Sequence, residues 1–134
     1  MKFIHVTDLH LTPPGELLWG LDPHARLASC MADIARHHGD AIFCAITGDL
    51  AERGDIAAYR ALRREIEALP IPTALLIGNH DDRDNFRAIF GGGDFIQRRI
   101  SRDGSHFVFI DTLKGPPSSA GRYDAPRRRW LAET

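Results

Sequence analysis

The stretch that decides the fold is Thr73-Ala-Leu-Leu-Ile77, followed at once by Gly78-Asn79-His80-Asp81. Four of the first five residues are apolar, which is typical of a short strand that is buried on both faces of a sheet. Gly78 ends this strand, and three polar side chains that can bind a metal or move a proton follow directly. Because ligands of open α/β sheets bind beyond the carboxyl ends of the strands, the stretch predicts a functional site there.

Two earlier stretches of the chain repeat this arrangement. Residues 2–7 form an apolar strand pattern that leads into Asp8-Leu9-His10, and residues 41–47 lead into Gly48-Asp49. Helical patterns separate the three strands: one begins after an expected N-cap at Asp22 and ends near His37-His38-Gly39, and the next runs from Ile56 to about Leu69 after Asp55. Strands that alternate with helices predict an α/β fold with a parallel sheet and right-handed crossovers.

The rest of the chain predicts smaller elements. A short helix is expected over residues 84–90, and Asp103-Gly104 between the strand-like stretches 95–101 and 106–111 predicts a β-hairpin. Pro116, Pro117 and Gly121 indicate a loop, after which a helix begins near Arg127 and Leu131.

Composition narrows the class of protein. The chain has 134 residues, 43% of them hydrophobic and 26% charged, with a net charge of −1. These values predict one globular domain over residues 1–134, with no membrane segment and no global attraction to nucleic acid. Cys30 and Cys44 are too few for a disulfide framework, so we expect reduced thiols and a cytoplasmic protein.

Four residues at the strand ends are candidate metal ligands: Asp8, His10, Asp49 and Asn79. If Asp8 and His10 continue an extended strand, their side chains leave it on the same side. Carboxylate, imidazole and amide ligands suit zinc, iron, manganese or cobalt better than calcium. Asp49 could bridge two such ions, and two ions spaced about 3.5–4 Å apart would clamp the oxygens of a phosphoryl transfer, with a bridging hydroxide as nucleophile.

His80 is expected to act on the substrate rather than on the metal. Its imidazole could donate to a phosphate oxygen or protonate the leaving oxygen, and Asp81 could orient that imidazole. Three further histidines, His5, His24 and His106, lack this context and are interpreted as structural.

The combination Asp8-x-His10, Gly48-Asp49 and Gly78-Asn79-His80-Asp81 resembles the calcineurin-like metallophosphoesterase superfamily. Within it, the start of the chain at Phe3 to His10 and the stretch Arg128-Arg129-Trp130-Leu131 look most like bacterial class III cyclic-nucleotide and glycerophosphodiester phosphodiesterases. The resemblance implies one metal on Asp8, His10 and Asp49, a second on Asp49 and Asn79, and His80 as the catalytic histidine. It also implies a four-layer α/β/β/α sandwich.

The family pattern continues with a lone histidine and a Gly-His-x-His segment, neither of which occurs here. The chain therefore resembles the N-terminal half of such an enzyme, truncated at its C-terminal side, with a sheet face that would lie open and favour a homo-oligomer. The function implied is hydrolysis of a small phosphodiester by a metal-bound hydroxide.

Other functions stay open at this point. A phosphomonoesterase or nuclease of the same superfamily would use the same ligands, although the chain has no basic stripe for nucleic acid. A catalytically silent scaffold for protein contacts would keep the fold and bind little metal. Trp19 could stack on a base or glycerol moiety, but packing against its own loop is the simpler expectation.

Overall fold

The structure is a computed structural model that describes residues 1–115 and 118–134. Pro116 and Pro117, which the sequence places in a loop, lie outside the described residues. In chain order the elements are β1 (Ile4–Thr7), α1 (Pro23–His37), β2 (Cys44–Thr47), α2 (Ile56–Glu67), β3 (Thr73–Leu76), α3 (Arg83–Phe90), β4 (Arg98–Arg102), β5 (Ser105–Phe109), β6 (Leu113–Gly115), β7 (Ser118–Gly121) and α4 (Ala125–Ala132).

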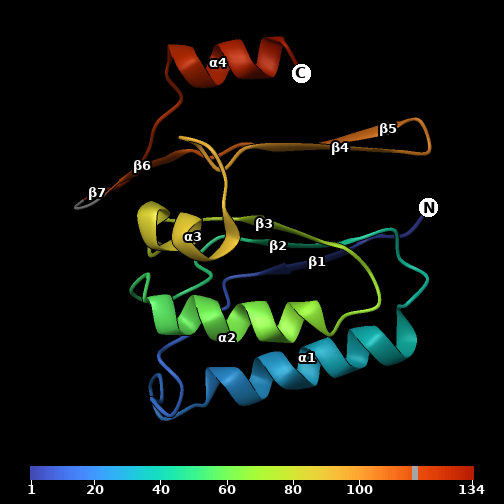
Figure 1. Ribbon diagram of the computed structural model, residues 1–134, viewed down its shortest axis with the longest axis vertical. Coiled ribbons are helices and arrows are strands. Elements are labelled where there is room, and N and C mark those ends of the chain that lie inside the picture. The colour runs from blue at the N-terminus through green and yellow to red at the C-terminus, as the bar shows by residue number, and fades with distance from the viewer. Residues whose placement is uncertain (116–117) are drawn as a thin grey trace.

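The first three strands form a parallel sheet in the order β1-β2-β3, as the sequence predicts. Figure 1 shows the layers: α1 and α2 cover one face of this sheet, the β4–β5 hairpin lies over the other face, and α4 lies beyond the hairpin. The order helix, sheet, hairpin, helix confirms the expected α/β class and the four-layer arrangement. None of the helices in the described ranges is long and apolar enough to cross a bilayer.

The helices begin close to the predicted positions. The Asp22 carboxylate caps α1 by accepting from the amides of His24 (2.9 Å) and Ala25 (3.2 Å). Asp55 stands at the N-cap of α2 but makes no side-chain cap bond. α3 begins at Arg83 rather than at residue 84, because Asp82 is its cap and accepts from the amide of Asn85 at 2.8 Å.

The principal core lies between the sheet and the two long helices. Buried side chains of α1 and α2 pack against β2, and the cluster includes Leu27, Met31, Ile34, Tyr59, Leu62, Cys44 and Ile46. On the opposite face, Phe43 packs edge-on against Phe107 of the hairpin, with ring centroids 4.8 Å apart. The sheet face that the sequence predicts to lie open is therefore partly covered, although Phe3 at its margin stays 45% exposed.

Beyond the strands, the loops after β1 and β2 remain side by side. The amide of His10 donates to the Asp49 carbonyl (2.8 Å), and the amide of Leu11 donates to the Leu50 carbonyl (3.1 Å). The loop after β3 is equally close, since a Cβ built on Gly78 would stand 2.3 Å from the Asp49 amide nitrogen. Three loops thus meet at the carboxyl edge of the sheet.

A buried ionic cluster fixes the C-terminal third of the chain. The Asp111 carboxylate is fully buried and accepts from Arg83 Nε (2.9 Å) and from two backbone amides. Arg127, which is only 2% exposed, donates to the Asp111 carbonyl (2.6 Å) and to the Leu113 carbonyl (2.9 Å), and its guanidinium lies over the Phe95 ring. These bonds attach the start of α4 to the hairpin region.

The same cluster explains one departure from the sequence prediction. The segment interpreted as a loop contains a short antiparallel pair, β6 with β7. Its first strand is held in place because Leu113 is buried and its carbonyl accepts from Arg83 and Arg127. Arg83 lies thirty residues before Leu113, and Arg127 belongs to α4, so no local sequence pattern predicts the pairing of β6 with β7.

Gly78→Ala tests the close approach of the loops. The new methyl group would overlap the Asp49 backbone, so we expect a loss of about 1–3 kcal/mol or more in the free energy of unfolding. Gly93→Ala is the matched control, because its Cβ would meet nothing nearer than 3.9 Å, and it should change stability by less than about 0.5 kcal/mol. Urea denaturation measures both; equal stabilities would refute the close contact.

Asp111→Asn tests the ionic cluster. Burial raises the pKa of the Asp111 carboxyl. The hydrogen bonds from Arg83 and the two amides lower it by more, so the pKa lies below its ordinary value. A depressed pKa means that this stabilisation is fully present above the ordinary value and is lost as the pH falls through the folded value. We expect the variant to lose about 3 kcal/mol at neutral pH.

Asp94→Asn is the control for that measurement, since Asp94 is exposed. It should unfold at the wild-type urea concentration. If the Asp111→Asn protein also did so, the cluster would contribute nothing to stability.

Candidate metal centre

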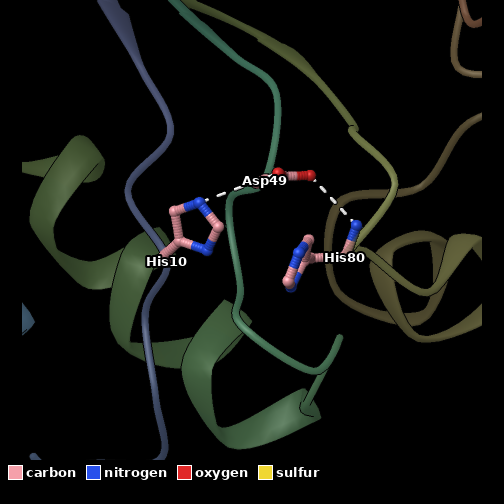
Figure 2. A group of neighbouring side chains, drawn as sticks. All are labelled: His10, Asp49 and His80. Carbon is pink, nitrogen blue, oxygen red and sulfur yellow. Dashed lines mark hydrogen bonds and ion pairs between the residues drawn. The ribbon is translucent and has the colours of Figure 1, made fainter. Parts of the chain in front are cut away.

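The three loops bring together His10, Asp49 and His80, each after a different strand (Figure 2). One ligand atom of each residue lies within 4.8 Å of the others. His10 Nε2 lies 3.7 Å from Asp49 Oδ2, and the backbone amide of His80 donates to Asp49 Oδ1 at 3.0 Å. Asp49 is therefore the centre of the cluster. Its Oδ1 accepts from the His80 backbone amide, and its Oδ2 faces His10.

Glu52 orients both imidazole rings. His10 Nδ1 donates to the Glu52 carboxylate at 2.6 Å, and His80 Nδ1 donates to the Glu52 backbone carbonyl at 2.9 Å. Since these oxygens can only accept, Nδ1 carries the hydrogen on each ring and Nε2 keeps its lone pair. This is the usual arrangement of metal-binding histidines. Glu52 is not predicted from the sequence, where its only signal is a carboxylate three residues after Asp49.

The cluster is partly shielded from solvent. The side chains of His10, Asp49 and His80 are 25%, 12% and 39% exposed. The hydrogen bond to the Glu52 carbonyl raises the pKa of His80. Burial opposes this effect, and the nearby Asp49 and Glu52 charges add to it. His80 therefore favours its protonated form more than a free histidine does.

The donor set fits a transition metal. Two imidazoles and one carboxylate are ligands of zinc, manganese, iron and cobalt, and such ligands stand about 2.0–2.2 Å from the ion. Ligands of one ion then lie about 3–4 Å apart, close to the 3.7 Å between His10 and Asp49.

Asp8 lies beside this cluster and is not one of its three members. Asp8 and His10 do not continue the strand as the sequence predicts, because β1 ends at Thr7 and both residues have positive φ, 56° and 46°. The Asp8 carboxylate instead lies next to Gly48, whose Cβ would meet Asp8 Oδ1 at 3.7 Å. Its role as a ligand stays a prediction.

Asn79 is exposed between Gly78 and His80, whose backbone amides donate to the carboxylates of Asp81 and Asp49 respectively. Among the described residues its side-chain amide has no hydrogen-bond partner. It is free to bind a ligand, and its assignment to a second metal also stays a prediction.

Asp81 does not orient His80, contrary to the sequence interpretation. Its carboxylate is only 2% exposed and accepts from the amides of Leu50 (3.0 Å), Ala51 (2.9 Å) and Gly78 (2.8 Å) and from the Tyr59 hydroxyl (2.8 Å). Burial raises the pKa of Asp81, and the four donors oppose that effect. Asp81 is a structural residue beneath the site.

The histidines interpreted as structural, His5, His24 and His106, are outside the cluster. His5 contacts Thr47 Oγ1 at 2.7 Å, His24 contacts the Thr12 carbonyl at 2.7 Å, and His106 contacts Ser101 on the hairpin at 2.9 Å. Their local partners agree with the structural interpretation.

Comparison with known proteins gives a consistent picture. Residues 1–129 match the family described as calcineurin-like phosphoesterase. A probable cyclic nucleotide phosphodiesterase of Rhodopseudomonas palustris is 42% identical over 84% of this chain and 43% of its own length. A cAMP/cGMP dual specificity phosphodiesterase of Mycobacterium tuberculosis is 32% identical over 97% of this chain and 43% of its own length.

A more distant relative, a probable glycerophosphodiester phosphodiesterase of Arcobacter nitrofigilis, is 26% identical over 72% of this chain. The chain spans less than half of the length of the first two relatives. The family match covers nearly the whole chain and contains every strand end that forms the cluster. The chain therefore belongs to the calcineurin-like phosphoesterase family.

Proposed function

We propose that this chain forms the metal-binding part of a phosphodiesterase that hydrolyses small phosphodiesters, with cyclic nucleotides as the first substrate class to test. The observation that carries the proposal is the convergence of His10, Asp49 and His80 at one sheet edge, with both imidazoles oriented by Glu52. The names of the relatives, three phosphodiesterases of cyclic nucleotides or glycerophosphodiesters, support the substrate class.

Two divalent ions would activate the phosphoryl group and the attacking water when bound. In the proposed arrangement His10 and Asp49 hold one ion with Asp8, and Asp49 shares a second ion with Asn79. The Asp49 side chain is suited to be a ligand that two ions share. Its Oδ2 faces His10, while its Oδ1 is directed to the loop after β3 by the His80 amide.

His80 would act as a proton donor to the phosphate or to the leaving oxygen. Its Nδ1 is engaged by the Glu52 carbonyl, so only Nε2 can face a substrate. The raised pKa of His80 favours the protonated ring that such a donor needs. His80 also belongs to the group whose ligand atoms lie within 4.8 Å of one another, so it could instead be a third metal ligand, and the two roles make different predictions for a variant.

A catalytically silent scaffold is the competing function. It would retain the sheet and the buried Asp81 contacts without binding metal tightly. Metal content and turnover of the same protein separate the two functions.

Asp49→Ala should remove the bound metal and, with it, the hydrolysis of bis(p-nitrophenyl) phosphate and cyclic AMP, because the central ligand is lost. Metal analysis after dialysis against manganese measures the first effect, and product release measures the second. Asp94→Ala, an exposed carboxylate away from the site, should keep both. Full metal content in the Asp49→Ala protein would refute the central role of Asp49, and a metal-free wild-type chain without turnover would favour the scaffold.

His80→Ala should keep the metal and reduce kcat by about 10²–10⁴-fold, the range of a general acid. His106→Ala is the matched control, since His106 is exposed on the hairpin. Loss of metal from the His80→Ala protein would instead make His80 a ligand. Unchanged kcat with metal retained would exclude it from the chemistry.

A further inference from the structure

A cavity of about 340 Å³ adjoins the candidate metal centre, formed by the loop between β1 and α1 and by the first half of α1. His10 belongs to the cluster and also lies on the cavity wall, together with its neighbour Asp8. Figure 1 shows this loop at the end of the molecule to which the β1 strand points. Its volume falls within the range of small-molecule sites, about 300–1,000 Å³.

Trp19 lines this cavity in an unusual conformation. Leu18 and Leu21 exchange two backbone hydrogen bonds (2.8 and 2.9 Å) around Trp19-Gly20, and both turn residues have positive φ, 49° and 79°. This turn favours asparagine or glycine at its first position, and a bulky aromatic residue there is strained. A local strain at a cavity wall points to a functional constraint.

The Trp19 side chain contributes little to folding. It is 86% exposed, so the expected packing against its own loop is wrong. The loop is instead fixed elsewhere: Thr12 Oγ1 donates to the Glu16 carbonyl (2.5 Å), and the Glu16 carboxylate pairs with Arg53 (2.8 Å). The turn therefore presents the indole from a tethered loop without burying it.

The other walls fit a flat, partly apolar ring with polar edges. Leu18, Leu21 and Leu27 supply apolar surface, and Arg26 supplies a guanidinium that has no ion pair or side-chain hydrogen bond in residues 1–115 and 118–134. An indole face stacks on any base, and guanidinium N–H groups donate to ring nitrogens and carbonyl oxygens of bases.

We propose that this cavity binds the nucleobase of a nucleotide substrate, with Trp19 stacking on the ring and Arg26 donating to its edge, while the phosphate occupies the adjoining metal centre. The proposal rests on the proposed function and adds to it a base site and two specificity residues. A glycerol group has no flat face for the indole and gains little from these walls.

Fluorescence tests the site without hydrolysis. Trp130→Phe leaves Trp19 as the only tryptophan, because the chain has two. With manganese present, 5′-AMP should quench Trp19 emission to saturation. Ribose 5-phosphate, which carries the same phosphate without a base, should not. Arg26→Ala should weaken the quenching by AMP, whereas Arg36→Ala, near the other end of α1, should not.

Kinetics give a second readout on the otherwise intact chain. Trp19→Ala should raise KM for 3′,5′-cyclic AMP by about 5- to 100-fold with kcat little changed, because stacking is lost. Hydrolysis of glycerophosphoethanolamine should not change. Trp19→Phe should keep most of the affinity. Leu17→Ala is the control in the same loop, since Leu17 is exposed but is not on the cavity wall.

A stability measurement separates function from folding. Trp19→Asn places a residue that tolerates positive φ in the turn, so the protein should unfold at an equal or higher urea concentration while AMP binding is lost. If Trp19 served only the fold, this variant would unfold more easily.

The outcomes distinguish the two proposals. Quenching by AMP without any turnover would retain the base site and reject the proposed function. Turnover of cyclic AMP with an unchanged KM in the Trp19→Ala protein would retain the function and reject the base site. Equal quenching by AMP and ribose 5-phosphate, or none by either, would also overturn the base site.

Discussion

The buried carboxylate of Asp81 holds together the two loops on which the candidate metal centre depends. It accepts three backbone amides, those of Leu50, Ala51 and Gly78, together with the Tyr59 hydroxyl. Without this acceptor, three amide donors would stay unsatisfied in a buried place, which is costly. Asp81 thereby fixes the loop after β2 against the loop after β3, and the absence of a side chain on Gly78 allows their contact.

The contacts between these loops hold the site residues in a backbone conformation that they would rarely adopt without such contacts. Asp8, His10 and Asp49 all have positive φ, 56°, 46° and 33°, although none is a glycine. Such strain persists only where surrounding contacts determine the backbone, as the paired loops do here. The result is a preorganised cluster in which Glu52 controls the directions of His10 and His80 from both its carboxylate and its carbonyl.

Much of the fold could be predicted because its signals are local. The apolar runs at the three strands, the Asp22 cap and the Asp103-Gly104 turn each depend on neighbouring residues, and the structure confirms them. The β6–β7 pair was missed, since it depends on buried bonds from Arg83 and Arg127. The interpretation of Asp81 as a partner of His80 was wrong because its true partners include Leu50 and Ala51, about thirty residues earlier.

By itself, the sequence determined that polar residues follow three strands of apolar pattern, and it predicted from them a candidate metal site at the carboxyl edge of the sheet. Only the tertiary structure decided which atoms meet there. It turned Asp8 and His10 out of the strand direction, gave Glu52 the orienting role, placed Asp81 beneath the site and left Trp19 exposed at a cavity. The physical reason is that strand patterns are local, whereas hydrogen-bond partners and loop contacts form between segments distant in the chain.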